Sequence, residues 1–179
     1  DEDEELKKVL DRAKKRVDEL VRNNEESLER VKRAVDRLIE KNERSLERAE
    51  DELRKLVKEI SDDEDLIKKI RDAVEEVRRL VEESRRRAEE VVKRAKELVE
   101  RSIRELERVV KRLADLVREG GDDVEKLKKE LDDMLRKLEE LSRRVNRTLE
   151  ELLRRIEELS REVDERIKKV LKEIKDRVK

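Results

Sequence analysis

The uncharged polar residues recur at a fixed spacing and are the first candidates for chemistry. The stretch NEESLER (24–30) is followed eighteen residues later by NERSLER (42–48). The same spacing separates the members of three pairs: Asn24 and Asn42, Ser84 and Ser102, Ser142 and Ser160. Amides and hydroxyls donate and accept hydrogen bonds but carry no charge for binding a cation. The pattern therefore indicates hydrogen bonding and disfavours a site for a polar ligand or ion.

Most residue types that enzymes rely on are missing. The chain has no histidine, cysteine, proline or aromatic residue, so it lacks the usual general base, a thiolate metal ligand and any disulfide. Carboxylates are numerous, but on exposed helix faces no burial raises their pKa values. No phosphate-binding glycine loop, zinc pattern, EF-hand loop or nucleophile elbow occurs. We expect no enzyme activity, no cofactor and no metal.

The charge balance excludes two classes of partner. Of 179 residues 59% are charged, yet 52 Lys and Arg nearly cancel 53 Asp and Glu. A nucleic-acid binder needs a basic surface, and an anionic membrane attracts a polybasic segment. No apolar run reaches the roughly 18 residues that span a bilayer, and the start DEDEE is opposite in charge to a secretory signal. We expect a soluble chain that needs no partner, with no targeting signal and no nucleic-acid or membrane binding; its localisation is otherwise unknown.

The eighteen-residue spacing corresponds to five whole turns at 3.6 residues per turn, so equivalent residues lie on one line of a helix. Around Asn24 seven adjacent wheel positions are apolar or small and polar, and they cover about 120°, the width of a core-facing stripe. These positions are Asn24, Ser27, Leu28, Val31, Val35, Leu38 and Ile39. Segments 84–117 and 141–174 repeat in the same way. A 3.6-residue period predicts nearly straight, untwisted helices.

Two short stretches interrupt the helical pattern. In SDDED (61–65), Ser61 with Glu64 three residues later forms a capping box. In GGDD (120–123), a glycine just past a helix end takes the left-handed conformation, and an aspartate followed by a glutamate caps the next helix. The residues assigned to this second turn are Gly120, Gly121, Asp122 and Glu125.

These breaks predict an all-α fold. Helices are expected at about 2–60, 62–119 and 123–178, each roughly 85 Å long, with turns at 61–64 and 120–122. Short connections make consecutive helices antiparallel neighbours. We expect a single domain over 1–179, a long up-down-up three-helix bundle.

The polar residues agree with this topology. In an antiparallel helix pair, the residue numbers of two residues at equal height add up to a constant. The two Asn–Ser pairs of the first and second helices both add up to 126, and half of that sum falls in the first turn. The serine pairs of the second and third helices give 244, centred on the second turn. We therefore predict two buried polar layers: Asn24–Ser102–Ser142 and Asn42–Ser84–Ser160.

The layers would select one helix register. A buried amide without a partner costs about 1–3 kcal/mol, so arrangements that place an asparagine against leucine or valine are disfavoured. In another interpretation the serines are small fillers bonded to carbonyls of their own helix, which suits Ser27 and Ser45 at the stripe edge best. Asn146 and Asp164 flank the third stripe and face solvent or reach a neighbouring helix, whereas Thr148 is expected to be exposed.

Taken together, the chain resembles computationally designed, parametrically generated helical bundles that carry hydrogen-bond networks. The resemblance rests on three equal helices, an eighteen-residue period, idealised caps, a core of Leu, Val, Ile and Ala with one Met (Met134), and a surface of Glu, Lys, Arg and Asp. It covers the whole chain in style and rests on no diagnostic motif. Spectrin-like repeats follow heptads with core aromatics, and exchangeable apolipoproteins contain proline. The resemblance implies a hyperstable scaffold or an assembly component.

Two functions therefore compete. The first is a monomeric structural scaffold with no natural biochemical activity. The second is an interaction or assembly component that accepts a further helix or self-associates through apolar residues at the stripe margins. Those margin residues are Ile39, Val57, Ile103, Val110 and Leu159. Amphipathic lipid binding is disfavoured, because acidic residues are mixed through the polar faces and aromatic anchors are missing.

Overall fold

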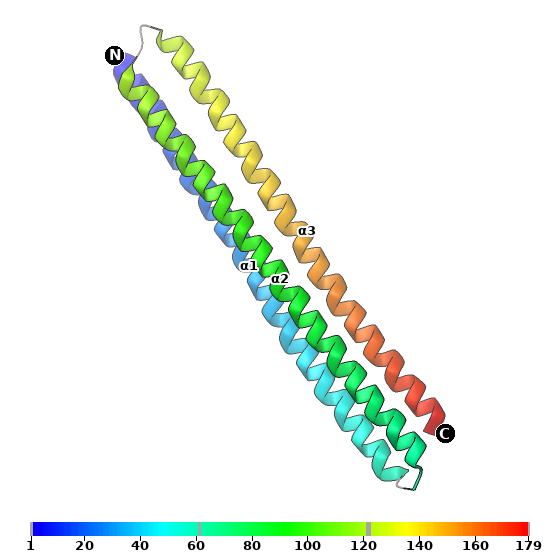
Figure 1. Cartoon of the computed structure of the whole chain (residues 1–179). Coiled ribbons are helices and arrows are strands. Elements are labelled where there is room, and N and C mark those ends of the chain that lie inside the picture. The colour runs from blue at the N-terminus through cyan, green and yellow to red at the C-terminus, as the bar shows by residue number, and fades with distance from the viewer. Residues whose placement is uncertain (1, 61, 121–122, 179) are drawn as a thin grey trace. The chain divides into compact units, whose positions relative to one another are not determined.

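The computed structural model describes residues 2–60, 62–120 and 123–178. The regular structure of these ranges consists of three long helices: α1 (Glu2–Glu59), α2 (Glu64–Glu119) and α3 (Val124–Val178) (Figure 1). No strand occurs in the described residues. The predicted all-α three-helix fold is confirmed.

Contacts group the chain into two compact units. Unit 1 comprises Asp1–Val31 and Arg94–Glu151, and unit 2 comprises Lys32–Lys93 and Leu152–Lys179. Each unit contains one segment of every helix, so each has its own three-helix core. The expectation of a single domain of straight, untwisted helices stays a prediction.

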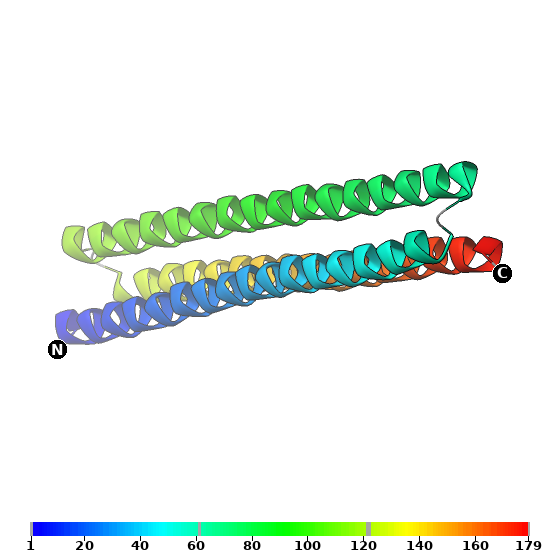
Figure 2. The same cartoon turned by 90° about the horizontal axis from the view of Figure 1, so that it is seen from below.

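The core of unit 1 shows how its helices run. Near one end Leu6 of α1 packs with Leu113 of α2 and Leu131 of α3. Further along α1, Leu20 shares a cluster with Leu106 and Leu138. Residue numbers thus rise together in α1 and α3 and fall in α2, which makes α2 antiparallel to both neighbours, as the ribbons also show (Figure 2).

The core of unit 2 is built in the same way. Leu53 and Ile70 pack with Ile174, and Ala49 lies in a second cluster with Val77 and Val163. All these side chains are buried, and each large one contributes about 1.5–3 kcal/mol through removal of its apolar surface from water. The stripe at helical spacing therefore supplies the main stabilisation in both units.

Aspartates cap the second and third helices. The backbone N–H of Leu66 donates to Asp63 Oδ1 at 3.2 Å, and that of Lys126 donates to Asp123 Oδ1 at 3.2 Å. Each carboxylate thus satisfies one of the N–H groups left free in a first helical turn.

The second helix begins at Glu64, two residues later than predicted. SDDED offers consecutive residues that can cap, and the one placed three residues before Leu66 makes the bond. The predicted cap Ser61 lies outside the described residues. Glu64 instead supplies negative charge in the first turn, where it suits the helix dipole.

The third helix begins at Val124, and its first turn contains the acidic residue Glu125. Of the turn residues assigned from sequence, Gly121 and Asp122 lie outside the described residues. Gly120 follows the last residue of α2 with φ of 56°, the left-handed conformation predicted for this position.

Replacing Gly120 should report the cost of this backbone conformation. A Cβ at Gly120 would meet no atom within 4 Å, so Gly120→Ala adds backbone strain without a steric clash. We expect Gly120→Ala to lower the free energy of unfolding by about 1 kcal/mol or more, because a left-handed L-residue is unfavourable. Gly120→Asn should lose less, since asparagine tolerates this region. Denaturant titration of both variants measures the difference, and equal stability of Gly120→Ala and the parent would contradict it.

Candidate functional site

The first polar layer is complete. Asn24 is fully buried, and its Nδ2 donates to Ser102 Oγ at 2.9 Å. Ser142 Oγ donates to Asn24 Oδ1 at 3.3 Å, and both serines are buried. The amide of α1 thus uses a donor toward α2 and its acceptor toward α3. One side chain therefore connects all three helices of unit 1.

The second layer is incomplete. Asn42 Nδ2 donates to Ser84 Oγ at 2.8 Å, and both residues are buried. Asn42 Oδ1, however, has no hydrogen-bond partner among the described residues. The predicted third member, Ser160, is only half-buried, whereas its equivalent Ser142 is 1% exposed. Ser160 sits at the edge of the unit 2 core and is not bonded to Asn42, so the predicted trio forms only its α1–α2 pair.

Two further serines connect α1 with α3. Ser27 Oγ donates to Asn146 Oδ1 at 3.2 Å in unit 1, and Ser45 Oγ donates to Asp164 Oδ1 at 3.3 Å in unit 2. The interpretation that Ser27 and Ser45 donate to carbonyls of their own helix is wrong, because both hydroxyls lie on the edge of α1 that faces α3 and donate to α3. Thr148 is exposed, as expected, and donates to the carbonyl of its own helix four residues back.

The two flanking contacts differ in charge. Asp164 of unit 2 also forms an ion pair with Lys41 at 3.0 Å. Eighteen residues before Lys41 and Asp164, the chain has Asn23 and Asn146. The two repeats thus share a serine donor on α1 at this edge, but its acceptor on α3 is the Asn146 amide in unit 1 and the Asp164 carboxylate in unit 2. In unit 1 the Ser27 hydroxyl also accepts from Arg30 Nη2 at 3.0 Å.

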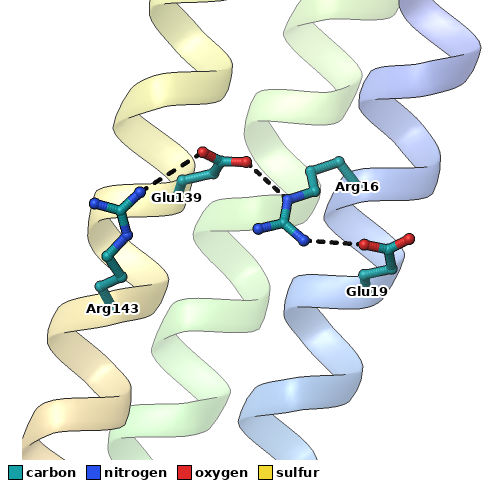
Figure 3. Close-up of polar contacts among 4 residues, drawn as sticks. All are labelled: Arg16, Glu19, Glu139 and Arg143. Carbon is teal, nitrogen blue, oxygen red and sulfur yellow. Dashed lines mark hydrogen bonds and ion pairs between the residues drawn. The ribbon is translucent and has the colours of Figure 1, made fainter.

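An ion-pair network adds to the α1–α3 contact of unit 1. Arg16 Nε donates to Glu139 Oε1 at 2.7 Å, and the same guanidinium reaches Glu19 at 2.9 Å (Figure 3). Arg143 extends the network from the other side of Glu139 at 3.9 Å. The hydrogen bond to Glu139, and then that to Glu19, raises the pKa of Arg16. The network connects α1 with α3 at the surface of unit 1.

The ion pairs between α1 and α3 were not predicted from the sequence, although their residue numbers follow a regular pattern. Four oppositely charged α1–α3 pairs share one index difference, 123: Glu5–Lys128, Arg16–Glu139, Lys41–Asp164 and Glu52–Lys175. A constant difference identifies parallel helices, just as the constant sum of the polar residues identified antiparallel ones. Applying that test to charged residues beside the stripes would have found them. Exposed ion pairs contribute little energy individually, so these four pairs add only modestly to the α1–α3 contact in each unit.

The first layer can be tested by removing the amide and its partners separately. Ser102→Ala with Ser142→Ala leaves Asn24 buried without its donor and acceptor. We expect this double variant to lose about 1–3 kcal/mol of unfolding free energy. Adding Asn24→Leu removes the stranded amide and should restore parental stability or exceed it. Denaturant titration of the two variants measures the difference, and a double variant as stable as the parent would show that the layer is not a network.

The ion pair between Glu5 and Lys128 should have a measurable effect on the pKa of Glu5. The hydrogen bond from Lys128 Nζ, at 2.8 Å, lowers the pKa of the Glu5 carboxyl. A lowered folded-state pKa means that this stabilisation is present above the unfolded-state pKa and is lost as pH falls through the folded one. Carboxyl ¹³C NMR should show the Glu5 pKa rise in Lys128→Met. Lys126→Met, at an exposed position nearby, is the control and should leave the pKa of Glu5 unchanged. The same Glu5 pKa in the parent, Lys128→Met and Lys126→Met would refute the pairing.

Other kinds of site are not seen in the part of the chain that the structure describes. Across residues 2–60, 62–120 and 123–178, no cluster of three potential metal ligands occurs. Within the same ranges, no helix is both long and apolar enough to cross a membrane. Comparison with known protein families, curated proteins and solved structures finds no match. What the polar layers do for this chain therefore follows from their own contacts.

Proposed function

We propose that this chain is a structural scaffold, a stable monomeric helical protein whose buried Asn/Ser contacts specify the register of its helices. The observation that carries the proposal is the Asn24 amide, which is 0% exposed and bonded to Ser102 on one side and Ser142 on the other. Hydrogen bonding of this kind needs no ligand, charge or reactive group. Its consequence is structural, since a register that places leucine or valine at the height of Asn24 would leave the amide without partners.

We also infer a designed origin, and hyperstability with it. Every level of the sequence favours the same structure: periodic apolar stripes, capping aspartates, a left-handed glycine and ion pairs at constant offset. Such agreement across levels is the criterion by which sequences are designed to specify one fold. Among the described residues, the hydrophobic members of the four core clusters are Leu, Ile, Val, Ala and one Met, a set of residue types typical of idealised packing.

The alternative function, binding of a further helix, would use a groove between α1 and α2 in unit 2. This groove of about 490 Å³ has the margin residue Ile39 on its wall, with Leu46 and Val81. Arg78 of α2 reaches across to Glu50 of α1 at 2.7 Å, which raises the pKa of Arg78, and Arg85 similarly approaches Glu43 at 3.8 Å. An entering helix would have to displace these ion pairs.

Large hydrophobic side chains also give little support to the alternative. Among the described residues none of them is exposed. The five margin residues named from sequence are all partly covered by their neighbours. The scaffold is therefore the better supported function.

Light scattering coupled to size-exclusion chromatography tests the choice. A scaffold should keep a mass near 21.6 kDa over a wide concentration range and should melt above about 90 °C, the usual mark of hyperstability. A mass that doubles or rises with concentration would favour the assembly component instead. In that case Ile39→Lys with Val57→Lys should restore the monomer, while Arg33→Lys on an exposed position should not.

A further inference from the structure

We infer that the α3 segment of unit 2 (Leu152–Val178) separates from its neighbours more readily than the α3 segment of unit 1 (Val124–Glu151). The inference rests on the proposed function, because it treats the polar layers as devices that hold the helices. It adds that the two layers hold α3 unequally. The third helix would then have one firmly bound part and one part able to open locally.

The difference between the two units in the cost of separating α3 originates at one hydrogen-bond acceptor, the Oδ1 atom of the layer asparagine. Opening α3 in unit 1 breaks the bond from Ser142 to Asn24 Oδ1, so separation has to overcome a buried hydrogen bond. In unit 2 the corresponding atom, Asn42 Oδ1, has no partner among the described residues while the unit is closed. Separation there lets water reach an acceptor that was buried without a donor. The same movement therefore costs less in unit 2.

The first two helices stay together during this opening. Asn42 donates to Ser84 at 2.8 Å, and this bond joins α1 to α2 without involving α3. The ion pair of Glu50 with Arg78 also connects α1 and α2. The event is therefore a release of α3 from an α1–α2 pair, and it does not require that unit 2 unfold as a whole.

The other polar contacts of α3 in unit 2 do not compensate. Asp164 accepts from Ser45 and pairs with Lys41, and Lys175 pairs with Glu52 at 3.0 Å. The basic side chains of these ion pairs are at least half exposed, so solvent screens them. Unit 1 has comparable surface contacts, which leaves the buried layers as the main difference between the two units.

Matched cysteine probes can test the inference, because the chain contains no cysteine of its own. Val145 and Val163 are eighteen residues apart on α3, and they are 4% and 5% exposed. Val145→Cys reports opening in unit 1, and Val163→Cys reports opening in unit 2. When reclosing is faster than labelling, the rate with a thiol reagent follows the population of the open state.

The full-length Val163→Cys variant should label about tenfold faster than Val145→Cys, the ratio expected for one unsatisfied buried acceptor. A second pair, Leu149→Cys and Ile167→Cys, is also separated by eighteen residues and buried, and it should give the same order. It replaces the first pair if either valine variant does not fold. Equal rates, or faster labelling in unit 1, would overturn the inference.

A second comparison identifies the cause. Adding Asn42→Leu and Ser84→Ala removes the unsatisfied amide, so labelling of Val163→Cys should slow about tenfold. The matched changes in unit 1, Asn24→Leu with Ser102→Ala and Ser142→Ala, should slow Val145→Cys labelling less than the unit 2 changes slow Val163→Cys labelling, because they remove a layer whose acceptor already has a donor. Unchanged labelling in unit 2 would refute the role of Asn42. The scaffold proposal is judged separately by molecular mass, so either idea can fail alone.

Discussion

A buried side-chain amide is costly unless its donor and its acceptor both find partners, and we propose that this constraint selects how the helices of unit 1 fit together. Asn24 meets it with one hydroxyl from α2 and another from α3. Apolar packing contributes more energy, but leucine and valine side chains can pack in many related arrangements. In the proposed function the amide favours, among these arrangements, those in which a serine lies at its height on each neighbouring helix. Specificity and stability would then have different sources in this protein.

The eighteen-residue repeat makes such specificity necessary. A helix displaced by eighteen residues presents a similar apolar stripe, and it again brings serine to the height of asparagine. The residues around the layers break this equivalence, because Asp164 lies beside Lys41 whereas Asn146 occupies the corresponding place in unit 1. A displaced third helix would separate the partly buried Asp164 carboxylate from Lys41, its ion-pair partner. The four α1–α3 ion pairs, whose residue numbers differ by a constant 123, also disfavour a displaced third helix.

Much of the fold could be predicted from sequence, because it depends on regularities that persist over many residues. The helical period, the two interruptions and the antiparallel order all follow from repeated positions. Local chemistry was harder to predict where neighbouring residues are chemically alike. SDDED contains consecutive residues able to cap a helix, and Asp63 was distinguished only by the position of the Leu66 N–H. Similarly, the sequence is compatible with hydrogen bonds from Ser27 and Ser45 to carbonyls of their own helix, and only the position of α3 beside α1 excludes them.

The sequence by itself determined which residues could form the layers: Asn24 with Ser102 and Ser142, and Asn42 with Ser84 and Ser160, follow from helical periodicity and antiparallel order. Tertiary structure decided which of those hydroxyls come within bonding distance. Ser142 is buried and bonds to Asn24, whereas Ser160 occupies the same place in the repeat but sits at the edge of its core, leaving Asn42 Oδ1 without a partner among the described residues. The physical reason is one of scale. Periodicity places a side chain on a face of a helix, but a hydrogen bond requires a distance of about 3 Å and a suitable direction, which only the packing of neighbouring helices provides.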